Sequence, residues 1–202
     1  MCSSDLESYE AARRLQSARQ AFDISGEREK NRELYGDSAF GRRCLLARKL
    51  VESGVAFIEV GQSSYDSHAD NFGWHKGLVP PMEHAWAGLL VDLQQRGLLD
   101  KTLVIWAGEI GRTPKINGTA GRDHWPKVFS VALAGGGVKR GHVHGSSDGT
   151  GGEPDSDPVG VEDYAATIFH QIGIDPARQI MTPGGRPQYI VKDGKVVREL
   201  LA

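Results

Sequence analysis

The stretch of residues 102–126 constrains the fold more than any other part of the chain. It opens with an apolar, β-branched-rich run at residues 102–107 and continues into a loop of glycine and charged residues. This pattern predicts a buried strand that ends at a loop. Because ligands and catalytic groups gather beyond the carboxyl ends of strands in open α/β sheets, we expect a functional site in this loop.

Strand and helix patterns alternate along the rest of the chain. We expect helices at residues 5–21, 41–53 and 161–172, a further helix from Pro80-Pro81 to Gly97, and strands at residues 55–60, 102–107 and 128–134. Alternation of this kind is typical of parallel βαβ packing with right-handed crossovers. Beyond the third strand we expect a short edge strand at residues 142–144 and a hairpin turning at Asp193-Gly194.

Composition excludes several classes of protein. The 202 residues are enough for one domain with a sizeable core. A net charge of −2 gives no reason to expect nucleic acid as a partner, and no apolar run approaches the roughly 18 residues of a membrane span. Two cysteines do not make a disulfide framework.

Histidine and carboxylate residues concentrate in the loops after the first two expected strands. The first loop contains an Asp-x-His pair, and the second contains a single Glu and then an Asp-His pair. The expected metal ligands are Asp66, His68, Glu109, Asp123 and His124. Neighbouring parallel strands lie about 4.8 Å apart, so the two loops would converge if these two strands are neighbours in the sheet. Carboxylate and imidazole ligands suit a divalent ion, zinc first, with calcium or manganese as further options.

Two arginines flank these carboxylates, and each has two interpretations. Arg112 and Arg122 carry guanidinium groups that bind tetrahedral oxyanions such as phosphate or sulfate in bidentate fashion. Each arginine equally fits a simple ion pair with a neighbouring acid. The acidic and histidine residues also have a structural interpretation, since Asp66 and His68 are residues that stabilise turns.

The residue strings around these loops resemble a known family. They are YDSHADN, LLDKTLVIWAGEIGRTP and GRDHWPKVFSVALAGGGVKRGHVHG. They closely resemble the bacterial domain-of-unknown-function family 1501, whose members look like distant relatives of the alkaline phosphatase and sulfatase superfamily. The resemblance covers nearly the whole chain.

The resemblance implies a fold and an activity. The expected fold is an α/β, alkaline-phosphatase-like sandwich with a mostly parallel central sheet flanked by helices. Residues 1–202 would be a single domain, the C-terminal portion of such a fold with its N-terminal part missing. The implied activity is metal-dependent hydrolysis of phosphate or sulfate esters on a small molecule or a glycan, with Arg112 and Arg122 at the non-bridging oxygens. Relatives of this kind are typically exported, although these residues themselves show no export signal.

The superfamily also has features that this chain lacks. Its enzymes carry an N-terminal strand with an acidic ligand and a nucleophile, and no such segment precedes the first expected helix. We therefore expect a hydrolase-like domain without its nucleophile. The alternative is a non-catalytic module that keeps the sulfatase-like fold and binds a partner or glycan. An intact minimal hydrolase that uses Thr113 or Ser64 has little support in the sequence.

Overall fold

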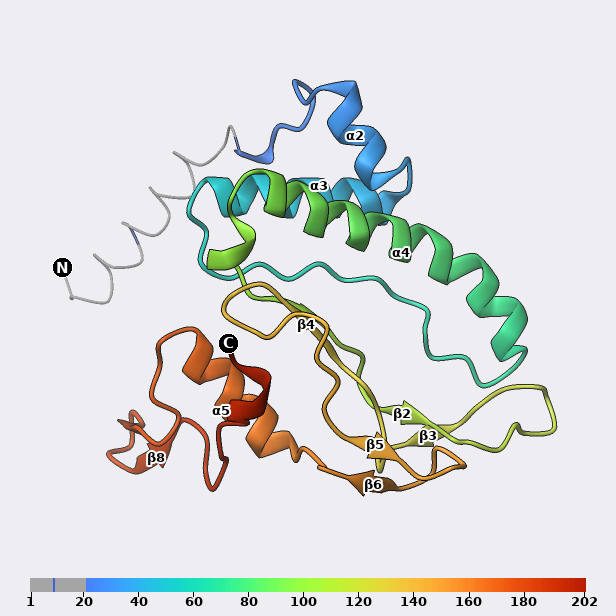
Figure 1. The fold of residues 1–202 in the computed structure, drawn as a ribbon, viewed down its shortest axis with the longest axis vertical. Coiled ribbons are helices and arrows are strands. Elements are labelled where there is room, and N and C mark those ends of the chain that lie inside the picture. The colour runs from blue at the N-terminus through green and yellow to red at the C-terminus, as the bar shows by residue number, and fades with distance from the viewer. Residues whose placement is uncertain (1–8, 10–20) are drawn as a thin grey trace. The chain divides into compact units, whose positions relative to one another are not determined.

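The computed structural model describes residue 9 and residues 21–202, and these form two compact units. Unit 1 comprises Met1–Asp66 and Phe72–Leu98, and unit 2 comprises Ser67–Asn71 and Leu99–Ala202. The helix expected at residues 5–21 falls almost entirely outside the described residues. The prediction that residues 1–202 form a single domain stays a prediction. Figure 1 shows the helices and strands of the described residues.

Unit 1 is helical. Its helices are α2 (Glu29–Tyr35), α3 (Ala39–Glu52) and α4 (Asn71–Gln95). The helix expected at residues 41–53 is confirmed as α3. The Ser38 hydroxyl accepts a hydrogen bond from the Gly41 backbone N–H at 2.9 Å and so caps its N-terminus. Gly54 follows the helix with φ +80°, the left-handed conformation that glycine adopts readily after a helix end.

The start expected for the following helix is wrong. We expected Pro80-Pro81 in a first turn, but α4 begins at Asn71 and contains both prolines. The proline ring removes one N–H donor at each position, yet its fixed φ near −65° is itself helical. The C-terminal half of α4 is also anchored by burial, because Ala85, Leu89 and Leu93 are all at most 9% exposed. Burial of this stripe outweighs the two lost donors.

The interior of unit 1 contains a charged network as well as apolar side chains. Tyr35, Cys44 and Leu45 are buried, and so is the apolar stripe of α4, the helix that runs beside α3 (Figure 1). Arg48 of α3 and Asp92 of α4 are both buried and form an ion pair, with 2.9 Å between the Arg48 Nε and an Asp92 oxygen. The network therefore joins the two helices.

Gly88 and Gly77, both in α4, form a matched pair for testing how closely that helix packs. A Cβ at Gly88 would lie 1.9 Å from the Leu34 carbonyl oxygen, whereas one at Gly77 would meet nothing within 4 Å. We expect Gly88→Ala to lower the free energy of unfolding by about 1–3 kcal/mol through overpacking. Gly77→Ala is expected to raise it by about 0.5–1 kcal/mol, because alanine favours a helix interior. Urea unfolding measures both, and equal effects would contradict the packing.

The strands of unit 2 form two-stranded antiparallel sheets throughout the described residues. The pairs are β1 (Val104–Trp106) with β4 (Ala132–Ala134), β2 (Gly111–Arg112) with β3 (His124–Trp125), β5 (Ser146–Ser147) with β6 (Pro154–Ser156), and β7 (Gln179–Met181) with β8 (Pro187–Tyr189). This contradicts the expected alkaline-phosphatase-like sandwich with a mostly parallel central sheet. The alternative function, a non-catalytic module with a sulfatase-like fold, is likewise not supported by this fold.

The central strands pair locally because the chain folds back on itself. β1 continues through residues 107–110 into β2, and β3 returns through residues 126–131 into β4, so the two pairs lie along one long hairpin. A hairpin closes a short loop, whereas a parallel pair requires a long crossover. Residues 55–60 are in no strand of the described structure, and Phe57 is 84% exposed. β1 is itself half-exposed rather than buried.

Two smaller expectations for the C-terminal part are also wrong, and one is confirmed. Residues 142–144 form no strand, and Asp193-Gly194 is not a hairpin turn, because the hairpin in this region joins β7 to β8. The helix expected at residues 161–172 is confirmed as α5 (Val161–Gln171). Two short 3₁₀ helices complete the unit, η2 (Leu99–Lys101) and η3 (Arg198–Leu200).

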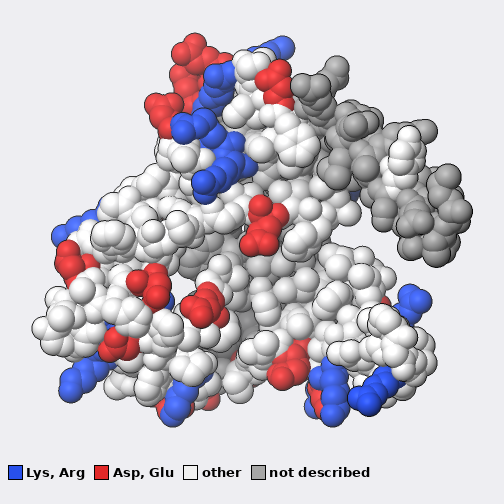
Figure 2. Space-filling model, turned by 180° about the vertical axis from the view of Figure 1, so that it is seen from behind, with Lys and Arg blue, Asp and Glu red and all other residues white. Residues whose placement is uncertain are grey.

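The described residues also bear on the expected absence of a membrane span. None of their helices is both long enough and apolar enough to cross a membrane. Basic and acidic side chains are interspersed over the described part of the face in Figure 2, which accords with the small net charge of −2.

Candidate metal site

Backbone hydrogen bonds join the Ser67–Asn71 segment to the tip of the long hairpin. The Asp70 N–H donates to the Thr119 carbonyl at 3.0 Å, and the Asn71 N–H donates to the Ala120 carbonyl at 2.9 Å. The Arg122 N–H donates to the Ser67 carbonyl at 3.3 Å. These contacts place the segment that contains His68 beside the strand that contains His124.

The close approach of the two segments depends on a glycine. A Cβ at Gly121 would lie 1.9 Å from the His68 carbonyl oxygen, a distance that no side chain tolerates. The hairpin tip is also closed on itself, since the Thr113 N–H donates to the Asp123 carbonyl at 2.8 Å and the Asp123 N–H donates to the Thr113 hydroxyl at 3.1 Å. The backbone around the site is therefore held by several independent bonds.

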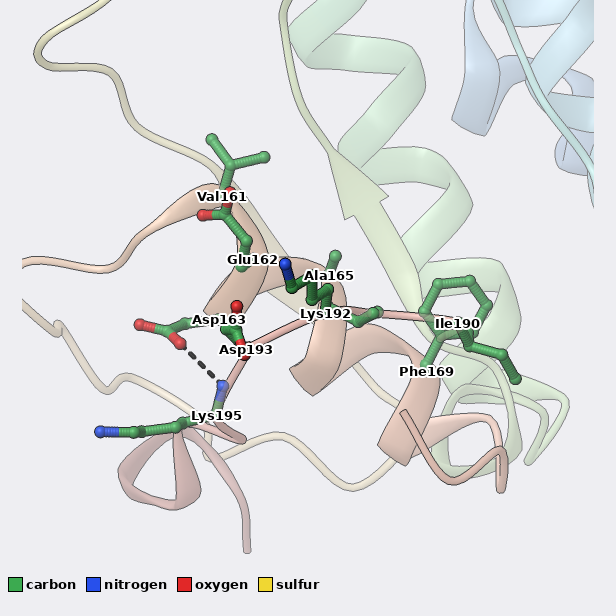
Figure 3. A pocket seen from close by; sticks show the side chains of 10 residues that line it. Val161, Glu162, Asp163, Ala165, Phe169, Ile190, Lys192, Asp193 and Lys195 are labelled. Carbon is green, nitrogen blue, oxygen red and sulfur yellow. Dashed lines mark hydrogen bonds between the residues drawn. The ribbon is translucent and has the colours of Figure 1, made fainter. Parts of the chain in front are cut away.

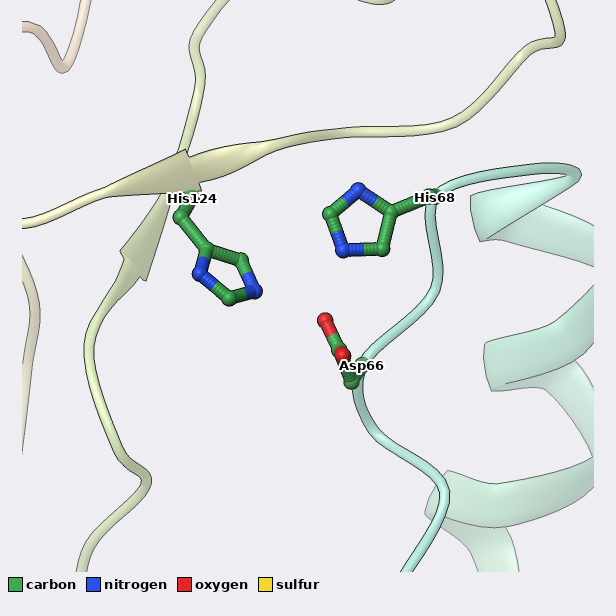
Figure 4. A group of neighbouring side chains, drawn as sticks. All are labelled: Asp66, His68 and His124. Carbon is green, nitrogen blue, oxygen red and sulfur yellow. The ribbon is translucent and has the colours of Figure 1, made fainter.

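Three of the predicted ligands come together at this junction. Asp66, His68 and His124 each offer a donor atom, and these atoms all lie within 4.8 Å of one another. Figure 4 shows the Asp66 carboxylate and the two imidazole rings directed toward a common space. Donors bound to one zinc ion at 2.0–2.2 Å lie at most about 4.4 Å apart. Small side-chain rotations would thus be enough to close the group around an ion.

Asp123 contacts the ring of His68 instead of joining the three donors. The distance from His68 Nδ1 to the Asp123 Oδ1 atom is 2.8 Å. An ionised carboxylate only accepts hydrogen bonds, so Nδ1 carries the proton in this pair. Hydrogen bonds from His68 and then from Asn117 lower the pKa of Asp123. An ion bound by His68 would therefore use Nε2, the other ring nitrogen.

The remaining predicted residues are distributed around this centre. Glu109 is exposed in the bend between β1 and β2 and does not belong to the group of three donors. Arg112 lies directly across the hairpin from His124. Side chains directly opposite in an antiparallel pair share one face, so Arg112 and His124 lie on the same face of the hairpin. Arg122 is half-buried and precedes Asp123.

Sequence reasoning missed one residue of this region, Asn117. Its side-chain amide donates to the Asp123 carboxylate and to the His68 carbonyl. The signal available was the Asn117-Gly118 dipeptide, which is a strong turn signal. It predicts the turn, but nothing in the dipeptide indicates where the side chain points.

A cleft lies elsewhere in unit 2. It has a volume of about 660 Å³ and is lined by α5 and residues 190–195 (Figure 3). The Asp163 carboxylate in it accepts a hydrogen bond from the Lys195 backbone N–H at 2.7 Å. Among the described residues, the cleft contributes no group of three metal donors. We therefore place the candidate site at the hairpin tip.

Comparison with known families agrees with the sequence resemblance. A family model described as a protein of unknown function (DUF1501) matches residues 2–201. The chain belongs to this family. No curated protein matches this DUF1501 chain, and no solved structure matches it either. The match supports a domain of unknown function and carries no information about a link to sulfatases or alkaline phosphatases.

Proposed function

We propose that this DUF1501 chain binds a divalent metal ion through Asp66, His68 and His124 and hydrolyses phosphate or sulfate esters. The observation that carries the proposal is the convergence of three donor atoms within 4.8 Å on segments held together by backbone hydrogen bonds. Two imidazoles and one carboxylate form a three-ligand set of the kind found in catalytic zinc sites, which keep a further position open.

The donor set favours zinc over the other ions considered. Calcium takes six to eight oxygen ligands, and two of the three donors here are imidazole nitrogens. Imidazole suits zinc and other transition metals, whereas manganese prefers carboxylate, carbonyl and water. All three side chains are exposed, so an ester on a small molecule or at the end of a glycan has access to them.

The residues around the donors have separate roles in the proposal. Asp66, His68 and His124 hold the ion, which supplies Lewis acidity toward an ester oxygen. Asp123 orients the His68 ring through the 2.8 Å contact at Nδ1. Arg112, on the same face of the hairpin as His124, would hold the non-bridging oxygens with Arg122. The choice of phosphate and sulfate esters rests on this arginine pair and on the resemblance to alkaline phosphatases and sulfatases.

Hydrolysis of p-nitrophenyl phosphate and p-nitrophenyl sulfate by the zinc-loaded chain tests the proposal. We expect turnover of one ester, and a fall of about 100-fold or more for His124→Ala, because removing a ligand should exceed the 10–100-fold effect of removing a ligand's hydrogen-bond partner. Glu109→Ala, outside the donor group, is the matched control and should retain activity. Absence of turnover above that of zinc in buffer would contradict the hydrolase proposal.

A further inference from the structure

The Asn117 side chain uses both ends of its amide at the hairpin tip. The Asn117 Oδ1 atom accepts hydrogen bonds from the Thr119 N–H at 3.0 Å, the Thr119 hydroxyl at 2.9 Å and the Gly121 N–H at 2.9 Å. The Nδ2 group donates to the His68 carbonyl at 3.0 Å and lies 3.3 Å from each Asp123 carboxylate oxygen. Three donors converge on Oδ1, so the amide has only one orientation that satisfies its neighbours.

The backbone fixes Asn117 as firmly as the side chain does. Its N–H donates to the Gly121 carbonyl at 2.9 Å, and its carbonyl accepts from the Ala120 N–H at 3.1 Å. The amide group is therefore presented from a closed turn. Its Nδ2 group donates directly to the His68 backbone carbonyl. It also contacts the Asp123 carboxylate, which in turn accepts from the His68 ring.

We infer that Asn117 is a positioning residue for the metal site. Asn117 holds Asp123 as the acceptor of the His68 Nδ1–H group, so that Nε2 would be the ring nitrogen available to a bound ion. This inference rests on the function proposed above. A histidine ligand commonly donates its other ring N–H to a carboxylate, which fixes the tautomer and the ring orientation. Here that carboxylate is more than half exposed, with 53% of its side chain accessible, so a second contact is required to keep it in place.

Asn117→Asp tests the inference with a side chain of the same shape. The substitution keeps an oxygen for the Thr119 and Gly121 donors, but it replaces the Nδ2 donor with an acceptor that faces the Asp123 carboxylate and the His68 carbonyl. We expect it to turn two attractive contacts into repulsive ones. Thr182→Val is the control, since it removes a turn hydroxyl between β7 and β8, where the Thr182 hydroxyl accepts from the Arg186 N–H at 3.1 Å, and it touches none of the contacts of Asn117.

The first readout needs no metal. Nitrogen-15 chemical shifts of the His68 ring, recorded on the metal-free protein at about pH 8 where an ordinary imidazole is neutral, report which ring nitrogen carries the proton. We expect Nδ1–H in the parent and in Thr182→Val, and a mixture of tautomers in Asn117→Asp. A merely structural role would leave the tautomer unchanged. If Asn117→Asp does not fold, Asn117→Ala removes the same donor without adding charge.

The second readout is the zinc dissociation constant, measured by competition with a chromophoric chelator. We expect it to rise by about 10–100-fold in Asn117→Asp, with no comparable rise in Thr182→Val. An unchanged tautomer in folded Asn117→Asp would overturn the inference, as would an unchanged zinc affinity. If the parent binds no zinc, the proposed function fails, and the His68 tautomer alone then decides whether Asn117 positions the ring.

Discussion

Replacing Arg48 with methionine is expected to lower the free energy of unfolding by about 3–5 kcal/mol. The Arg48 side chain is only 2% exposed and forms ion pairs with three acidic residues, Glu27, Glu52 and Asp92. Methionine fills the space of the aliphatic part of the arginine side chain. The measured loss of stability therefore reports the removal of the guanidinium group and not a loss of packing. Asp92, with a side chain 3% exposed, would keep Tyr35 and Arg96 but lose one of its cations. Glu27, with 11% of its side chain exposed, would lose the Arg48 cation, and leaving a poorly exposed charge without its partner is strongly destabilising.

The exposed pair between Arg140 and Asp100 provides the control. These side chains are 69% and 82% exposed, with 3.2 Å between nitrogen and oxygen. Because exposed pairs contribute little, Arg140→Met should change the free energy of unfolding by less than about 1 kcal/mol. Urea denaturation followed by tryptophan fluorescence measures both variants. A loss in Arg48→Met no larger than that in Arg140→Met would contradict the importance of the buried network.

Arg48→Met should also alter how the free energy of unfolding depends on pH in the acid range. Burial alone raises the pKa of Glu27, but hydrogen bonds from Arg48 and Asn31 outweigh it and lower the pKa to about 2 from its ordinary 4.5. A group whose pKa is lowered by folding stabilises the protein above the ordinary value, and this stabilisation is lost as the pH falls toward about 2. In Arg48→Met this part of the acid dependence should become shallower.

Helices were predictable from the sequence where periodicity and end signals agree. α3 and α5 have apolar stripes at helical spacing, and each is followed by a glycine with positive φ, Gly54 and Gly173. The start of α4 was not predictable, because Pro80 and Pro81 are strong local signals that burial in the rest of the helix overrides. Local signals decide a helix end only when tertiary packing does not oppose them.

The sheet was not predictable, because alternation and β-branched residues identify a strand without identifying its partner. The run at residues 102–107 does contain a strand, β1, and the run at residues 128–134 contains β4. We expected parallel neighbours, and the structure pairs these two segments with each other in an antiparallel hairpin. Residues 55–60 have the same strand composition and yet join no ladder in the described structure.

The candidate site was predictable in residue type but not in the role of each residue. Asp66, His68 and His124 were expected as ligands, and the structure brings their donor atoms together. Asp123 and His124 are adjacent in an extended segment, where successive side chains point to opposite faces. This alternation explains why Asp123 contacts Nδ1 of His68 while His124 faces the space shared with Asp66.

Zinc affinity across a set of single variants is the measurement that tests the metal site most directly. We expect the parent to bind one zinc ion per chain, and Asp66→Ala, His68→Ala and His124→Ala each to weaken binding by more than about 100-fold. Glu109→Ala should bind as the parent does, because Glu109 lies outside the donor group. A parent that takes up no zinc would contradict the account, and so would a His124→Ala variant that binds zinc as tightly as the parent.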